Sequence, residues 1–173
     1  NAVLLNQISY REAIELAFYG ASVIHPKTLQ PLQKKEIPLY VKSFINPTLP
    51  GTKVSKGVDL EPKTSCFIVK KNQILISLSS IDFSFIMEEN ISEIFALFHK
   101  FKIKVSLIQN SAISFSVCVE DKFDKFQELK TILSKKFKVS YNDNVSLYTI
   151  RHFDAASAEV VEKDKNVLVK QIS

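Results

Sequence analysis

Residues that commonly carry catalytic or metal chemistry are few in this 173-residue chain and lie far apart in the sequence. The histidines, His25, His99 and His152, cluster neither with one another nor with a cysteine pair, so the sequence gives little support to a metal site. Cys66 and Cys118 each lie in an apolar, strand-like run, which is typical of buried free thiols in a reducing compartment. We therefore predict no metal site and no disulfide framework.

Glycine and proline are distributed unevenly. All three glycines and all six prolines lie in the first 62 residues. The stretch 63–173 therefore contains no glycine-rich loop of the kind that cradles nucleotide phosphates. The chain has the length of one ordinary domain or two small ones, and the change of composition near residue 62 indicates a domain boundary.

The charge balance argues against nucleic acid and membrane partners. There are 23 Lys and Arg against 18 Asp and Glu, but the arginines are only Arg11 and Arg151. Nucleic-acid readers usually rely on Arg, so the lysine excess indicates a solvated surface. We interpret Arg151 and His152 as part of a solvated loop, with an anionic ligand or a partner subunit as the alternative. No apolar run approaches the roughly 18 residues of a membrane span, and no signal-peptide layout opens the chain.

The first 62 residues combine short helices and a strand. Ser9 and Glu12 form a capping-box pattern that predicts a helix over 9–18, and Gly20 suits its left-handed end. The other elements expected here are a helix over 27–34, a strand over 39–44, turn residues over 46–52 and a polar linker over 53–63.

Residues 73–141 show strand and helix patterns in the order β-α-β-β-α-β, the ferredoxin-like motif. Asn90 and Glu93 form a capping box, and Ile91, Ile94 and Phe98 lie on one helical face. The expected strands cover 73–81, 103–109, 112–119 and 137–141, and the second helix covers 122–135.

A second, incomplete round follows. A turn at 142–144, a strand over 145–150, a helix over 154–162 and a strand over 166–172 are predicted, and the apolar run 67–69 adds a strand. The fold class is therefore α+β, with tandem ferredoxin-like units, one inserted in the other. We predict three parts: 1–62, an inserted unit at 73–141, and a second unit formed by 64–72 with 142–173.

The run from Leu16 to Thr28 resembles the end of the catalytic domain of aspartate kinases. It is followed at the expected distance by Ile37–Ser43, Asn46-Pro47 and Pro50-Gly51-Thr52, which resemble the same family. The two ferredoxin-like units resemble the tandem ACT regulatory domains of that family. The resemblance implies that 1–62 is the tail of an α/β amino-acid kinase domain with its linker, and that the remainder is regulatory.

Aspartate kinases phosphorylate the side-chain carboxylate of aspartate with ATP and Mg, and end-product amino acids inhibit them through the ACT domains. The resemblance implies that the catalytic residues and most nucleotide contacts lie upstream of Asn1. We therefore expect no catalytic residue and no cofactor in this fragment, and no kinase activity from it alone. A cytoplasmic location and a homodimer formed through the ACT domains are also implied.

The resemblance places contacts to an amino-acid effector on Asn90, Ile91, Val105, Ser106, Gln109, Asn110 and Ser111. A free amino acid has a carboxylate that suits the amide groups at a helix N-terminus. Gln109-Asn110 resembles a pair found in some threonine-responsive members. Lysine-responsive members carry Asp where Ser106 stands, to hold the effector ammonium. The resemblance implies lysine or threonine as the effector.

Two other functions are compatible with the pattern. The ACT units could serve only to hold a dimer together, without binding an effector. The same β-α-β-β-α-β order also occurs in the RRM fold, but the strand expected over 112–119 lacks the glycine and cation of the RNA-binding motif. RNA binding is therefore the weaker alternative.

Overall fold

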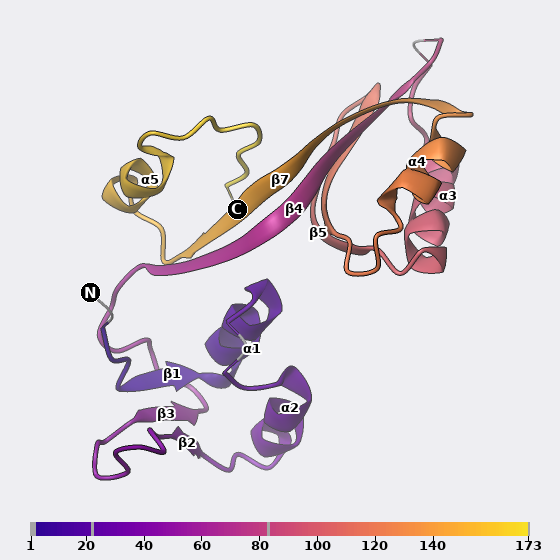
Figure 1. Cartoon of the computed structure of the whole chain (residues 1–173). Coiled ribbons are helices and arrows are strands. Elements are labelled where there is room, and N and C mark those ends of the chain that lie inside the picture. The colour runs from indigo at the N-terminus through magenta and orange to yellow at the C-terminus, as the bar shows by residue number, and fades with distance from the viewer. Residues whose placement is uncertain (1–2, 22, 83, 173) are drawn as a thin grey trace. The chain divides into compact units, whose positions relative to one another are not determined.

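The computed structural model describes residues 3–21, 23–82 and 84–172 (Figure 1). Its elements are β1 (Gln7–Ser9), α1 (Tyr10–Tyr19), α2 (Pro26–Lys34), β2 (Leu39–Val41), β3 (Thr52–Ser55), β4 (Cys66–Ser80), α3 (Glu88–Lys100), β5 (Lys104–Asn110), β6 (Ser114–Glu120), α4 (Phe126–Leu133), β7 (Phe137–Arg151) and α5 (Ala155–Glu162).

The chain forms two compact units. Unit 1 contains Asn1–Val69 with Tyr148–Ser173, and unit 2 contains Lys70–Leu147. Unit 2 is therefore an insertion in the chain of unit 1, and β4 and β7 connect the two. The range 73–141, predicted as the inserted unit, lies within unit 2.

Unit 1 contains a three-stranded sheet in the order β1-β3-β2, with β1 parallel and β2 antiparallel to β3. The predicted caps of α1 are confirmed. Ser9 accepts a hydrogen bond from the Glu12 amide at 3.1 Å, and Gly20 ends the helix at a φ of 119°. The sheet and the first two helices share a core made of Ile8, Tyr10, Ala13, Leu29, Val54 and Leu60.

The prediction of a polar linker over 53–63 is wrong at its start. Residues 52–55 form β3, the central strand of the unit 1 sheet, and Val54 is completely buried. A single apolar residue among polar neighbours gives no alternating pattern. The strand therefore depends on backbone pairing with β1 and β2, which sequence periodicity does not report.

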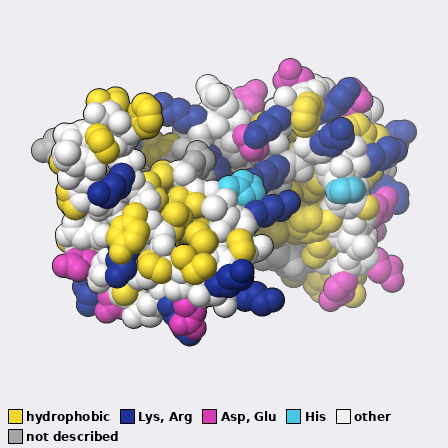
Figure 2. Space-filling model, turned by 90° about the horizontal axis from the view of Figure 1, so that it is seen from below, with side chains coloured by type: hydrophobic (Ala, Val, Ile, Leu, Met, Phe, Trp, Pro, Cys, Tyr) yellow, Lys and Arg dark blue, Asp and Glu magenta, His cyan; other side chains and the backbone are white. Residues whose placement is uncertain are grey.

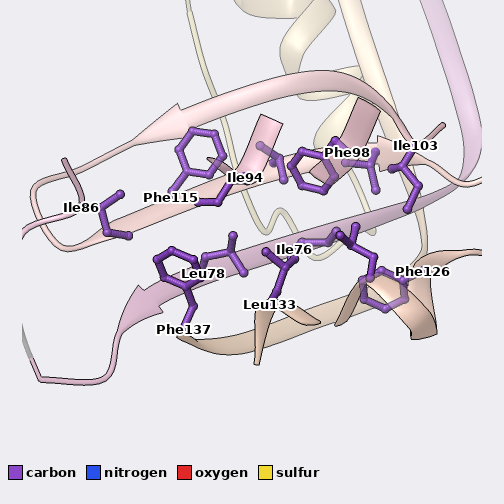
Figure 3. Packing of buried hydrophobic residues seen from close by; sticks show 13 residues of the cluster. Ile76, Leu78, Ile86, Ile94, Phe98, Ile103, Phe115, Phe126, Leu133 and Phe137 are labelled. Carbon is purple, nitrogen blue, oxygen red and sulfur yellow. The ribbon is translucent and has the colours of Figure 1, made fainter. Parts of the chain in front are cut away.

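Unit 2 is built around a four-stranded sheet in the order β5-β6-β4-β7, and β6 runs antiparallel to both of its neighbours. Helices α3 and α4 lie beside each other on one face of this sheet (Figure 1). The predicted β-α-β-β-α-β order is thus confirmed. The buried side chains between helices and sheet form one cluster (Figure 3), composed of Ile76, Leu78, Ile86, Ile94, Phe98, Ile103, Phe115, Val117, Val119, Phe126, Leu129, Leu133 and Phe137.

Strands β4 and β7 are each 15 residues long, so two predictions are wrong. The run 67–69 is not a separate strand, and residues 142–144 do not end β7. Asn72 and Asn144 adopt left-handed backbone angles, with φ of 55° and 50°, inside these strands. Asparagine tolerates this conformation, so the backbone is irregular there while the strand continues.

Two further boundaries differ from the predictions. Helix α4 begins at Phe126, because the Asp121 carboxylate accepts hydrogen bonds from the Lys125 and Phe126 amides at 3.0 and 2.8 Å. The strand expected over 166–172 is also wrong, because these residues lie outside the helices and strands. Helix α5 is confirmed, with Asp154 accepting a hydrogen bond from the Ser157 amide at 2.7 Å.

Left-handed backbone occurs at several residues other than glycine. Among the described residues of the stretch 63–173, which has no glycine, six are left-handed: Asn72, Lys102, Asp124, Asn144, His152 and Asp164. Within the described residues, no helix is both long and apolar enough to cross a bilayer.

Replacing Leu129 with Ala should destabilise unit 2 by about 2–5 kcal/mol, because the side chain is completely buried and its removal leaves a cavity. Thr131→Ala on the exposed side of the same helix is the matched control, expected within about 0.5 kcal/mol of the parent. Urea unfolding followed by circular dichroism measures both. Equal effects of the two substitutions would contradict the assigned core.

Candidate effector site in the inserted unit

The predicted effector residues come from the start of α3 and from β5 with its following turn. The Ile86 amide donates a hydrogen bond to the Ala112 carbonyl at 3.0 Å. This bond holds the loop before α3 against the turn after β5. The structure therefore brings the surroundings of Asn90 and of Asn110 to the same end of the unit 2 sheet.

Asn90 is not the residue that caps α3, contrary to the prediction. The N-cap is Met87, and Asn90 is the third residue of the helix. Its Oδ1 accepts a hydrogen bond from the Met87 amide at 3.0 Å, which is the returning half of a capping box. Asn is a common N-cap and Met is not, so the sequence pattern favoured the wrong position. The Asn90 side-chain oxygen is thus engaged in holding the helix start.

The side chains of Ile91 and Val105 stabilise the core of unit 2. Both are partly buried and pack against the core between the helices and the sheet. A ligand at these positions would meet backbone groups and the rims of apolar side chains. Their assignment as effector contacts remains a prediction, restricted by the structure to that kind of contact.

Ser106 is the extra residue of a β-bulge. Val105 pairs with Val119 and Leu107 pairs with Cys118, so Ser106 has no partner of its own in the ladder. The Lys70 ammonium lies 3.5 Å from the Ser106 hydroxyl. Burial lowers the pKa of Lys70, and the charge of Lys104 lowers it further. The charge of Glu120 acts in the opposite direction, so charges of both signs lie near Lys70.

The bulge decides which way the next side chains point. Gln109 pairs with Ser116, and Asn110 pairs with the buried core residue Phe115. Paired residues share a face of a sheet and successive residues alternate. Asn110 is therefore on the face that α3 covers, and Gln109 is on the opposite face. A small ligand beside α3 would meet Asn110 rather than Gln109.

Ser111 shapes the turn between β5 and β6. Its hydroxyl lies 2.6 Å from the Ser114 hydroxyl and accepts a hydrogen bond from the Ser114 amide at 3.2 Å. These bonds fix the turn that receives the Ile86 amide. Ser111 would thus contribute to a site by fixing the position of this turn.

A hollow of about 420 Å³ opens beside the start of α3. This volume is in the range of small-molecule sites. Asn90 is the only predicted effector residue among those lining it, which are Ser80, Ile81, Asp82, Ser84, Phe85, Ile86, Asn90, Lys135, Lys136 and Phe137. The remaining predicted residues, Ile91 on α3 and those on β5 and in its turn, do not line this hollow.

Unit 1 contains an ionic cluster that sequence reasoning missed. The buried Glu12 carboxylate of α1 accepts hydrogen bonds from Arg151 Nη2 at 2.9 Å and Arg151 Nε at 3.3 Å. His152 Nε2 lies 3.1 Å from the same carboxylate. The interpretation of Arg151 and His152 as a solvated loop is thus wrong. The anion that they meet is a side chain of the same chain, 139 positions away from Arg151, and no local pattern connects the two.

Burial and the charges of this cluster shift the pKa values of Glu12 and Cys66. Burial raises the pKa of the Glu12 carboxyl, but the hydrogen bonds and charges of Arg151 and His152 outweigh it, so the pKa lies below its ordinary value. Burial and the nearby Glu12 charge raise the pKa of the Cys66 thiol. Cys66 and the buried Cys118 are both free thiols, as predicted.

Comparison with known proteins supports a relationship to one enzyme family. The profile of the amino acid kinase family matches residues 1–43. Lysine-sensitive aspartokinase 3 of Escherichia coli is 30% identical over 116 residues, covering 67% of this chain and 26% of that protein. The bifunctional aspartokinase/homoserine dehydrogenase of Haemophilus influenzae is 33% identical over 150 residues, covering 83% of this chain and 18% of that protein.

The crystal structure of E. coli aspartokinase III in complex with lysine and aspartate matches 94% of this chain with a TM-score of 0.73 and 25% identity. The aspartokinases are therefore homologues of this chain. The chain spans 39% of that structure and about a fifth to a quarter of the aspartokinase sequences that it matches. The resemblance found in the sequence is confirmed.

The described residues do not fit a site for the ATP and Mg of an aspartokinase. Among them, no group of three or more His, Cys, Asp or Glu side chains is arranged to hold a metal ion. The glycines of the chain, at 20, 51 and 57, do not form a phosphate-binding motif. No step of phosphoryl transfer is therefore assigned to these residues.

Glu12→Gln should destabilise unit 1 by about 1–3 kcal/mol at neutral pH, because it leaves the Arg151 guanidinium without its carboxylate. Since the folded-state pKa of Glu12 is lowered, its contribution is present above the ordinary glutamate pKa and is lost as the pH falls through the folded value. Thermal unfolding measured from pH 7 to pH 3 should show the two proteins converging in acid. A constant difference across that range would contradict this role of the charge.

Proposed function

We propose that this chain is the regulatory part of an aspartokinase, joined to the end of its kinase domain. The observation that carries the proposal is the similarity to E. coli aspartokinase III, which extends over 94% of the chain and includes both units. The kinase-family match is confined to residues 1–43, whereas unit 2 has the ferredoxin-like order of an ACT domain. On this proposal the complete protein phosphorylates aspartate with ATP and Mg in the cytoplasm, and this fragment alone is inactive.

The proposed effector is a free amino acid bound at the end of unit 2 where α3 begins. Asn110 lies on the face covered by α3, and the bond between Ile86 and Ala112 closes the loop and the turn around that end. The first turn of α3 offers amide groups and a partial positive charge to a carboxylate. The related E. coli aspartokinase III forms a complex with lysine, which is a free amino acid of the proposed class.

The residues on β5 favour threonine over lysine as the effector here. Lysine-responsive members of the family carry Asp where Ser106 stands, so the carboxylate that would hold a lysine ammonium is missing at this position. Gln109-Asn110 resembles a pair found in some threonine-responsive members. We therefore propose threonine as the first ligand to test.

L-Threonine should raise the unfolding midpoint of the chain, since a ligand at 100 times its Kd stabilises the folded state by about 2.7 kcal/mol. L-Lysine and L-methionine should have smaller effects at the same millimolar concentrations. Asn110→Ala should abolish the threonine shift because its side chain faces the α3 side. Thermal shift measurements, with circular dichroism to check folding, test this expectation.

Gln109→Ala is the matched control for that experiment. It removes a neighbouring exposed carboxamide from the opposite face of the same strand and should leave the threonine shift intact. Equal loss in both variants would contradict the placement of the ligand beside α3. If none of the three amino acids moves the midpoint, the sensing role of this chain is wrong.

A second candidate function, a dimerisation module, is favoured by the edge of the unit 2 sheet. Strand β5 is an edge strand, and exposed edges readily pair with another chain. Large apolar side chains are exposed nearby, with Ile108 and Ile113 each 44% exposed and Phe85 64% exposed. Self-association would cover this surface, and it is compatible with effector binding.

We expect the chain to form a homodimer that Ile108→Lys weakens by at least tenfold, since a charge on the paired edge opposes strand-to-strand contact. Val160→Lys is the control, because Val160 is 69% exposed on α5 and does not belong to the unit 2 sheet. Light scattering after gel filtration over a range of concentrations measures the mass. A monomer at every concentration would contradict the dimer.

The structure offers no support for the RNA-binding alternative. On the face of the unit 2 sheet opposite the helices, β6 presents Ser114, Ser116 and Cys118 rather than aromatic side chains. RRM domains need aromatic residues there to stack bases. On the molecular face shown in Figure 2, lysine and arginine side chains are interspersed with acidic ones rather than gathered in one stripe.

A further inference from the structure

The cluster of Glu12, Arg151 and His152, which we call the Glu12 joint, holds a buried carboxylate by both of its oxygens. Arg151 reaches Oε1 and Oε2, and His152 shares Oε1. Among the described residues, Glu12 is the one buried residue that carries a charge, with 8% of its surface exposed. A buried carboxylate that loses its cation is strongly disfavoured, so the joint resists separation of α1 from the end of β7.

Both connections between the units pass close to this joint in the chain. Arg151 is the last residue of β7, which leaves unit 2. Ser65 directly precedes β4, which enters unit 2, and its hydroxyl donates to the His152 carbonyl at 2.8 Å. His152 itself turns the chain through a left-handed φ of 54°. The beginning of one connection and the end of the other are thus fastened together and to α1.

The helix fastened in this way belongs to the kinase part of the chain. Helix α1, Tyr10–Tyr19, lies within residues 1–43, which match the amino acid kinase family. β4 and β7 are neighbouring strands of one sheet, and Ser65 and Arg151 lie at the ends of these strands that belong to unit 1. A shift of Arg151 displaces the partner of Glu12 directly.

We propose that the Glu12 joint couples the state of unit 2 to helix α1. In this proposal a more stable unit 2 keeps Arg151 in contact with Glu12 and protects the α1 amides from exchange. Destabilising unit 2 weakens the ion pair between Glu12 and Arg151 and exposes these amides. The coupling is a property of this chain and does not depend on which ligand unit 2 binds. Its use for feedback control of a kinase rests on the proposed function above.

Hydrogen exchange of the α1 amides tests the coupling in a double-mutant cycle on the intact chain. Leu129→Ala loosens unit 2 through its core, and Arg151→Met removes the cation of the joint. We expect Leu129→Ala to raise α1 exchange by about tenfold in the parent and by less than about twofold in the Arg151→Met background. Exchange of the unit 2 amides should rise equally in both backgrounds.

Two outcomes would overturn the proposal. One is α1 exchange that does not respond to Leu129→Ala in the parent, and the other is an equal response in both backgrounds. Lys125→Met, which removes an exposed ion pair with Glu128, is the control and should preserve the full response. If Arg151→Met fails to fold, Arg151→Lys keeps the charge but loses the two-pronged contact, and it should give an intermediate response.

A threonine arm separates this proposal from the sensing role. Threonine that binds unit 2 should slow exchange in unit 2 and, through the joint, in α1 of the parent but not of Arg151→Met. Absence of any threonine effect on unit 2 would contradict effector binding and leave the double-mutant cycle as the test of the joint. Protection of unit 2 without a change in α1 would contradict the joint alone.

Discussion

The pairing of β4 with β7 is the constraint on which the rest of the structure depends. Each strand is 15 residues long and runs from one compact unit into the other. Within unit 2 they are the two strands that start and finish the β-α-β-β-α-β order, and outside it they continue into unit 1. Their pairing therefore completes the unit 2 sheet at the place where the inserted segment leaves and rejoins the chain of unit 1.

Much of the fold follows from local sequence signals. The apolar stripe of α3, the alternation of Phe115, Val117 and Val119, and the caps of α1 each predict an element that the structure contains. Some errors concern residues whose conformation is decided by pairing with distant strands, whereas those at the starts of α3 and α4 concern local caps. Val54 becomes a central strand through pairing, and Asn144 permits a left-handed residue inside β7 where its type suggested a turn.

The candidate site likewise depends both on local sequence signals and on contacts between distant residues. The family resemblance indicated two segments, the loop before α3 and the turn after β5, that the structure holds together, and effector binding there stays a prediction. The bulge at Ser106 was not predictable from a strand pattern, yet it decides that Asn110 rather than Gln109 lies on the helix-covered face. The Glu12 joint was also beyond sequence reasoning, because it unites residues far apart in the chain.

The left-handed residues of the stretch 63–173 have a consequence for the unfolded chain. Six such positions are occupied by Asn, Asp, Lys or His, and none by Gly. A glycine would relax the backbone strain at each of these positions, but it would also widen the set of conformations open to the unfolded chain. The stretch 63–173 thus has local strain in its folded state and a smaller loss of backbone entropy on folding. The restricted backbone of the unfolded chain therefore contributes to the stability of the folded state.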